Sequence, residues 1–118
     1  MDENPITPIN QSTGNGKNPV YLPQLKAFDG PDVQTGKDVL VKGLEEMAEL
    51  VEAGKDWMKA GPDDIDKKRE HLLYEFGDVL QTMANIAHEM GMSDTEINWG
   101  YQQTVAKNTE RGRFTEGW

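Results

Sequence analysis

Glycine and proline divide most of this chain into three helical segments, and that division limits the fold more than any other feature. The segments run from about Gly36 to Ala60, from about Ile65 to Met90 and from Ser93 to about Arg111. Gly61-Pro62, Gly91 and Gly112 stop them, because glycine and proline end or break helices. No strand-like alternation of apolar and polar residues competes in this region. The sequence therefore predicts an all-α fold.

The residues before the first helix have a different character. Residues 1–36 contain repeated turn signals, among them Gly14-Asn15-Gly16 and Gly30-Pro31. We interpret this part as an irregular N-terminal arm, followed by an all-α domain over residues 37–118. Within the arm, the apolar piece Val20–Phe28 is suited to pack as an extended strap on a neighbour.

Composition excludes several functions. The chain has 118 residues, which suits one domain. Its net charge of -9 argues against unaided binding to nucleic acid or to an anionic membrane, since both need a basic patch. The absence of cysteine excludes a disulfide framework and a thiolate zinc site, and it fits a cytoplasmic protein. We expect neither a signal peptide nor a transmembrane helix, because no segment has the required apolar run.

Acidic residues crowd the first helical segment, which contains Glu45, Glu46, Glu49 and Glu52. The apolar stripe of this segment, at helical period, consists of Leu40, Leu44, Met47 and Val51. At ~100° per residue, Glu45, Glu46 and Glu49 fall roughly opposite that stripe. Taken alone, this placement favours a solvated acidic face. Apolar residues nevertheless border the acids on both sides, so the acids lie in a gap between apolar edges.

The second segment favours a cation site. Its apolar stripe consists of Leu72, Phe76, Val79, Leu80, Met83, Ile86, Ala87 and Met90. Glu75 falls at the edge of this stripe, and Asp78 lies one step further toward the flank. An isolated carboxylate near a core is unfavourable unless it is paired or bound to a metal. Glu75 and Asp78 share one helix face, as do Glu46 and Glu49, because each pair is spaced i, i+3. Four carboxylates on antiparallel neighbours predict magnesium or manganese. His71 is interpreted as an ordinary surface residue.

The third segment begins at a capping-box pattern, Ser93-x-x-Glu96. Its predicted buried face carries Ile97, Tyr101, Thr104 and Val105. Asn108 lies on the same face, with Arg111 beside it and Lys107 slightly further round. The helix dipole explains basic residues near a C-terminus but does not explain an inward asparagine. A basic cluster facing four carboxylates is what a metal-bound polyphosphate needs, since Lys107 and Arg111 can bind phosphate oxygens.

The combined pattern resembles that of a known superfamily. Glu45-Glu46-x-x-Glu49 followed by Glu75-x-x-Asp78 resembles the EExxE…ExxD signature of the all-α nucleoside triphosphate pyrophosphohydrolases. This superfamily includes MazG-like proteins, dimeric dUTPases, dCTP pyrophosphatases and phosphoribosyl-ATP pyrophosphohydrolases. Leu72–Ser93 looks like its second core helix, and Lys107–Phe114 is similar to the basic end of its third. The resemblance covers about residues 37–114 and departs at the N-terminus, where many relatives have a preceding helix.

The resemblance implies magnesium-dependent hydrolysis of nucleoside triphosphates between the α- and β-phosphates, with manganese as a substitute metal. The implied metal ligands are Glu46, Glu49, Glu75 and Asp78. Glu45 is implied to hold or activate the attacking water. Lys107 and Arg111 are implied to neutralise phosphate charge during catalysis. The implied substrate-binding set comprises Lys107, Asn108, Arg111 and Arg113.

Two alternatives stay open. A phosphoribosyl-ATP pyrophosphohydrolase would share the fold and the metal site but should ignore ordinary deoxynucleoside triphosphates. A catalytically silent helical oligomer, acting as a nucleotide-binding or regulatory module, would show no magnesium dependence. In each case three helices of this size bury little surface alone. We therefore expect a homo-oligomer, either a dimer or a tetramer, that completes its core across a subunit interface.

Overall fold

The computed structural model describes residues 18–114 of the chain. Within these residues it contains no strand and three helices: α1 (Lys37–Met58), α2 (Ile65–Glu89) and α3 (Asp94–Glu110). The all-α prediction is confirmed, and each helix begins and ends within two residues of its predicted bounds. None of the three helices is both long and apolar enough to cross a membrane.

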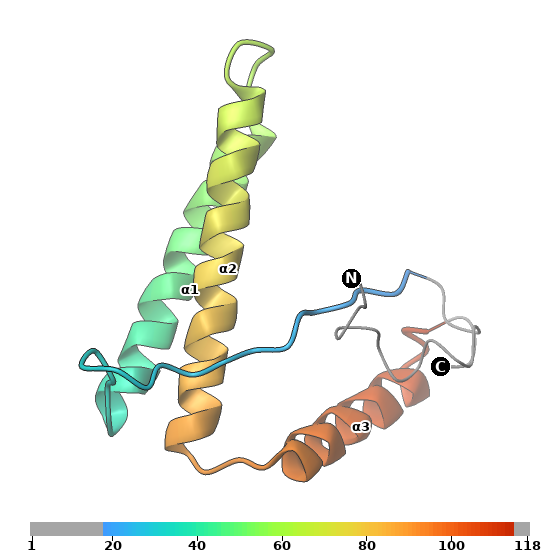
Figure 1. Ribbon diagram of the computed structural model, residues 1–118. Coiled ribbons are helices and arrows are strands. Elements are labelled where there is room, and N and C mark those ends of the chain that lie inside the picture. Colours follow the sequence, from blue (N-terminus) through green and yellow to red (C-terminus); the bar gives the residue numbers. More distant parts are fainter. Residues whose placement is uncertain (1–17, 115–118) are drawn as a thin grey trace, which may run out of the picture. The chain divides into compact units, whose positions relative to one another are not determined.

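The chain divides into two compact units. One unit is Leu25–Met92, which contains α1 and α2, and the other joins Met1–Gln24 to Ser93–Trp118, which contains α3. In the first unit, α1 and α2 lie side by side as an antiparallel hairpin (Figure 1). A tight turn reverses the chain, because the Gly61 N–H donates to Asp64 Oδ1 at 3.0 Å and Pro62 cannot continue a helix.

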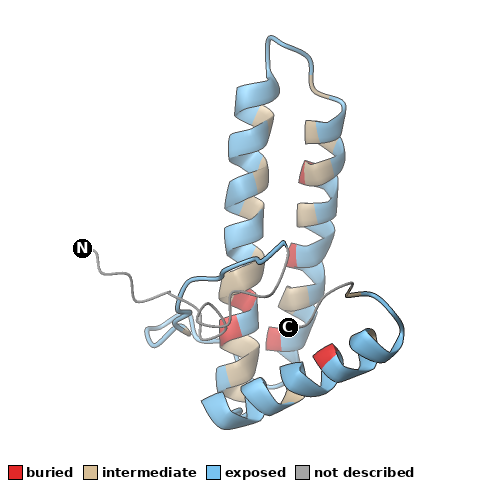
Figure 2. Cartoon of the chain, turned by 90° about the vertical axis from the view of Figure 1, so that its right-hand side faces the viewer, coloured by how far each residue is buried: buried red, intermediate tan, exposed pale blue. Residues whose placement is uncertain are grey.

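The face of α1 that packs toward α2 repeats every seven residues. Val39, Glu46 and Ala53 are buried, and Gly43 and Leu50 between them are half-buried. Alternate steps of three and four residues are typical of helices that pack lengthwise against a neighbour. Figure 2 shows buried and intermediate positions of α1 and α2 along the sides where the two helices face each other.

The predicted apolar stripe of α1 is one residue out of register. Its members are exposed, with relative exposures of 46% for Leu40, 73% for Leu44, 48% for Met47 and 54% for Val51. Each follows a residue of the packed face and is therefore rotated from it by ~100°. The prediction that Glu46 lies opposite the packed face is wrong, since this residue is only 8% exposed.

The predicted stripe of α2 is confirmed in part. Its half-buried members are Leu72, Val79, Leu80, Ile86 and Ala87, and its exposed members are Phe76, Met83 and Met90. Thr82, which the stripe omits, is buried. Its hydroxyl donates to the Asp78 carbonyl at 3.0 Å. Because this bond satisfies the hydroxyl within its own helix, threonine can occupy the packed face.

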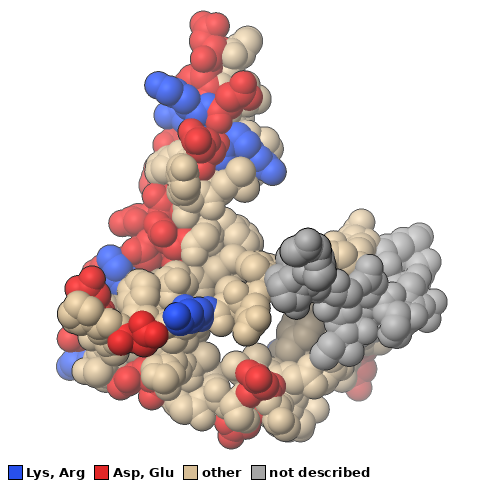
Figure 3. Space-filling model, in the orientation of Figure 1, with Lys and Arg blue, Asp and Glu red and all other residues tan. Residues whose placement is uncertain are grey.

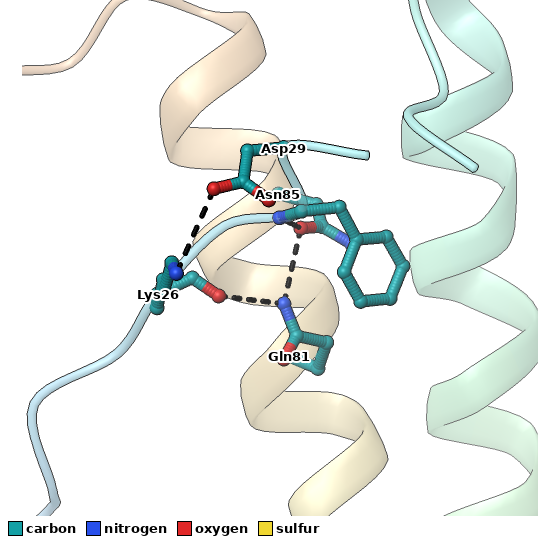
Figure 4. A network of polar contacts seen from close by, with 5 residues as sticks. Lys26, Asp29, Gln81 and Asn85 are labelled. Carbon is teal, nitrogen blue, oxygen red and sulfur yellow. Dashed lines mark hydrogen bonds and ion pairs between the residues drawn. The ribbon is translucent and has the colours of Figure 1, made fainter. Parts of the chain in front are cut away.

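A strap, residues 25–36, which turns at Gly30–Val33, lies against α2 and is held by polar side chains at four-residue intervals along that helix. The bonds join Gln81 to the Lys26 carbonyl (2.8 Å), Asn85 to the Phe28 N–H (2.9 Å) and Glu89 to the Gly36 N–H (2.7 Å). Figure 4 shows the bonds made by Gln81 and Asn85. From Leu25 onward, the segment predicted to pack on a neighbour is thus held by its own chain. Residues 1–17 of the predicted arm lie outside the described residues.

In the second unit, α3 begins at the predicted capping box. Ser93 Oγ accepts from the Glu96 N–H at 3.2 Å, and Glu96 Oε1 accepts from the Ser93 N–H at 2.9 Å. Val105 of the predicted buried face is 7% exposed, whereas Ile97 is 46% and Tyr101 51% exposed. The capping prediction is confirmed, and within the described residues the buried face of α3 is narrower than predicted.

Candidate metal centre

Three of the four predicted acidic ligands converge on the hairpin. Glu46 of α1 and Glu75 and Asp78 of α2 each offer one carboxylate oxygen, and these oxygens lie within 4.8 Å of one another. The three-residue step from Glu75 to Asp78 places both on one face of α2. Negative charges this close repel one another. A divalent cation bound among the three carboxylates would replace that repulsion by attraction to the cation.

Glu46 is the most enclosed member of the cluster. Its Oε2 accepts from Lys42 Nζ at 3.1 Å, one turn earlier on the same helix. Its Oε1 is buried and has no hydrogen-bond partner among the described residues. A buried carboxylate oxygen without a partner is rare, because losing its hydration is unfavourable. Glu46 therefore presents one oxygen that a ligand could satisfy.

Glu75 repeats this arrangement on α2. Its side chain is 15% exposed, and its Oε2 lies 3.0 Å from His71 Nε2. Its Oε1 is buried and, within the part of the chain that the structure describes, has no partner. His71 is exposed, as predicted, and its contact with Glu75 was not predicted. The four-residue spacing between His71 and Glu75 was the sequence signal for this contact.

The clustered acids alter the proton affinity of their neighbours. The charge of Glu46 is the largest cause that raises the pKa of the exposed Glu49, and the charge of Glu75 adds to it. The pKa of Lys42 is also raised, chiefly by its hydrogen bond to Glu46. Figure 3 shows acidic side chains along the hairpin, with lysine and arginine side chains among them near the α1–α2 turn. The cluster thus lies in an excess of negative charge that a bound cation would offset.

Glu45 and Glu49 lie outside the group of three carboxylates, and both are exposed. Glu45 Oε1 lies 3.8 Å from Lys42 Nζ. Glu49 is near enough to the cluster for Glu46 and Glu75 to shift its pKa. The structure therefore brings three predicted ligands together, while the ligand role of Glu49 and the water-activating role of Glu45 stay predictions.

A glycine that sequence reasoning missed sets the spacing of the helices beside the cluster. A Cβ atom at Gly43 would lie 3.0 Å from Ile86 Cδ1 and 3.1 Å from Thr82 Cγ2. Both distances are shorter than ordinary van der Waals contact. Gly43 therefore allows α1 and α2 to approach where Glu46 must meet its partners on α2.

The predicted phosphate-binding residues belong to the other unit. Lys107 and Arg111 are exposed at the end of α3, and Asn108 is half-buried. Asn108 Oδ1 accepts from Arg113 Nη1 at 2.9 Å, which links two members of the predicted substrate-binding set. The structure describes each unit by itself, so the placement of these residues opposite the carboxylates stays a prediction.

The donor set of the hairpin fits a hard divalent cation. Mg²⁺ and Mn²⁺ prefer oxygen ligands, and Mg²⁺ commonly keeps several waters beside one or two carboxylates. Glu46 and Glu75 each offer a buried oxygen that has no partner among the described residues. Asp78 is exposed, which leaves that side of the cluster open to water.

Comparison with known proteins adds no relative. No family model, no curated protein and no solved structure matches the chain. The function is therefore proposed from the motif residues and from the geometry of the carboxylate cluster.

Proposed function

We propose that this chain is a magnesium-dependent nucleoside triphosphate pyrophosphohydrolase of the MazG-like type. In the proposed reaction a water oxygen bonds to the α-phosphorus, and the bond from this phosphorus to the α–β bridging oxygen breaks. The products are a nucleoside monophosphate and pyrophosphate. The observation that carries the proposal is a pair of buried oxygens, Glu46 Oε1 and Glu75 Oε1, which have no partner within residues 18–114 and lie beside the carboxylate of Asp78.

Two physical arguments support a metal at this cluster. A buried carboxylate oxygen without a partner destabilises a protein by about 1–3 kcal/mol, and a bound cation removes that penalty. A chain with a net charge of -9 also needs a cation between its carboxylates and an anionic substrate. When bound, Mg²⁺ supplies charge neutralisation at the phosphoryl oxygens and lowers the pKa of water.

The proposal gives each group of residues a separate task. Glu46, Glu75 and Asp78 hold the metal, and Glu45 orients or deprotonates the attacking water. Lys107 and Arg111 neutralise the charge that develops on the phosphates, while Asn108 and Arg113 bind phosphate or sugar. The tasks of Glu45 and of the four residues on the α3 unit rest on the family resemblance.

A substrate panel tests the reaction. The full chain is incubated with canonical and modified nucleoside triphosphates and with phosphoribosyl-ATP, in Mg²⁺, in Mn²⁺ or in a chelator. Pyrophosphate and orthophosphate are measured separately. We expect pyrophosphate from nucleoside triphosphates only when metal is present. Orthophosphate as the direct product would contradict α–β cleavage, and activity on phosphoribosyl-ATP alone would identify the alternative enzyme.

Substitutions in the cluster test the metal site. Glu75→Gln and Asp78→Asn should each lower turnover by at least about 100-fold, the scale on which one electrostatic stabiliser acts. Helicity measured by circular dichroism should not change. Glu70→Gln, at an exposed acid of the same helix, is the matched control. Unchanged turnover in both cluster variants would end the proposal, and Glu49→Gln in the same assay decides whether Glu49 is a fourth ligand.

A further inference from the structure

A cavity of about 400 Å³ lies between the strap and the helical hairpin. Its lining includes Phe28 and Gln34 of the strap, Glu46 of α1, and Asp78, Gln81 and Asn85 of α2. This volume falls within the about 300–1,000 Å³ that is usual for small-molecule sites. Two members of the carboxylate cluster thus form part of the wall of a larger cavity, and the remaining wall combines a further acid, Asp32, and a base, Lys42, with amide, hydroxyl and aromatic side chains.

The strap side of the cavity offers free hydrogen-bonding groups. Asn85 Oδ1 accepts from the Phe28 N–H at 2.9 Å and from Gln81 Nε2 at 3.1 Å. Gln81 Nε2 also donates to the Lys26 carbonyl at 2.8 Å (Figure 4). These bonds use one end of each amide. The described residues supply no hydrogen-bond partner for the other ends, which are the donor Asn85 Nδ2 and the acceptor Gln81 Oε1.

We infer that this cavity receives the nucleoside part of the substrate, an inference that rests on the proposed function. An amide donor, an amide acceptor and an aromatic ring are the groups that proteins use to bind a nucleobase, by its polar edge and by its face. Phe28 supplies the ring, and Gln81 and Asn85 supply the polar groups. The phosphates of the same molecule then lie toward Glu46 and Asp78. The strap is thereby a wall of the substrate site, and Gln81 and Asn85 position it.

Binding measurements separate the nucleoside from the phosphates. The full-length protein in Mn²⁺ is titrated with a nucleotide whose α–β bridging oxygen is replaced by an imido group, and separately with inorganic tripolyphosphate. Phe28→Ala should weaken nucleotide binding about tenfold, because stacking of a base on an aromatic ring is lost. Tripolyphosphate, which has no nucleoside, should bind equally to both proteins. Leu25→Ala, an apolar strap residue outside the cavity lining, should leave both affinities unchanged.

A second variant tests the anchoring of the strap. Asn85→Ala removes the acceptor for the Phe28 N–H and should weaken nucleotide binding without a change for tripolyphosphate. Equal nucleotide affinity in wild type and Phe28→Ala, or an equal loss for nucleotide and tripolyphosphate, would overturn the inference. If the wild-type chain binds no Mn²⁺, the proposed function itself has failed. If it binds Mn²⁺ and tripolyphosphate but Phe28→Ala changes nothing, only the present inference has failed.

Discussion

Each enclosed glutamate of the cluster has one oxygen held by a basic residue one turn earlier on its own helix. Lys42 contacts Glu46 Oε2 at 3.1 Å, and His71 contacts Glu75 Oε2 at 3.0 Å. In both residues the other oxygen is buried without a partner among the described residues. Outer contacts of this kind orient the side chains that bind metals. The two glutamates are thus preorganised by contacts within their own helices.

At this scale we predict that Glu75→Gln has opposite effects on the metal-free and metal-bound proteins. Without metal, replacing the enclosed carboxylate by a neutral amide should stabilise the fold by about 1 kcal/mol, which raises Tm by a few degrees. The rise in Tm that saturating Mn²⁺ gives the wild type should be absent, because a ligand is lost. Thermal unfolding with and without Mn²⁺ measures both effects.

The control is Glu70→Gln, which removes an equal charge from an exposed position of α2. It should leave both Tm values within about a degree of wild type, since surface substitutions change stability little. A Glu75→Gln protein that still gains the full Tm increase with Mn²⁺ would show that this carboxylate binds no metal.

Among the elements, α1 carries two helical repeats that differ by one residue. One runs through Val39, Gly43, Glu46, Leu50 and Ala53, and the other through Leu40, Leu44, Met47 and Val51. The second repeat is more apolar, yet the first packs on α2. Gly43 and Ala53 keep the first repeat narrow, so the helices can approach and Glu46 can reach the carboxylates of α2. Small residues at two of its positions, Gly43 and Ala53, rather than greater hydrophobicity, distinguish the packed face from the exposed one.

Gly43→Ala tests this close approach. In the middle of a helix, alanine is favoured over glycine by about 1 kcal/mol. At Gly43 the new methyl group would press on Ile86 and Thr82, and Thr82 is held by its bond to the Asp78 carbonyl. We expect Gly43→Ala to be less stable than wild type by about 1–3 kcal/mol and to bind Mn²⁺ more weakly, as measured by denaturant unfolding and calorimetry.

The matched variant on the same helix is Gly54→Ala. Its Cβ would lie 3.9 Å from Leu72 Cδ1, which is ordinary contact. This variant should be more stable than wild type by up to about 1 kcal/mol and should bind Mn²⁺ equally well. If Gly43→Ala and Gly54→Ala have the same stability and the same affinity, close approach at Gly43 has no role in the site.

At the scale of the whole molecule, the described part of the chain buries little apolar surface. Its buried apolar residues are Val39, Ala53, Ala84 and Val105. The apolar repeat of α1 that does not pack on α2 remains exposed over three turns, with Leu44 73% exposed. Steps of four, three and four residues suit packing against another helix. We therefore propose that a second copy of this chain covers that repeat in a homo-oligomer.

Sedimentation equilibrium of Leu44→Asp tests the assembly. A charge at the centre of the exposed repeat should not be tolerated in an apolar contact between subunits, so the variant should sediment as a monomer where the wild type is a dimer or tetramer. Leu44→Met keeps volume and apolarity and should assemble as the wild type does. A monomeric wild type, or an unchanged mass in Leu44→Asp, would exclude this interface.

Local features of the chain were predictable because their causes are local. Breakers at Gly61-Pro62 and Gly91 end the helices, and the capping box at Ser93 begins the last one. The step from Glu75 to Asp78 places both acids together on any helix. These features need only the geometry of one helix, so the sequence alone determined the three helices and one side of the candidate metal site.

The tertiary structure decided which face of α1 packs, and with it the enclosure of Glu46. Periodicity defines the faces of a helix but does not say which face meets a neighbour, since that choice depends on how closely two backbones can approach. The position of the strap depends on contacts such as the hydrogen bond from the Phe28 N–H to Asn85 Oδ1. These two residues are 57 positions apart in the sequence, so no local pattern encodes the contact. The sequence by itself thus determined the helices and the acids they carry, whereas contact between distant segments decided which acids meet and what encloses them.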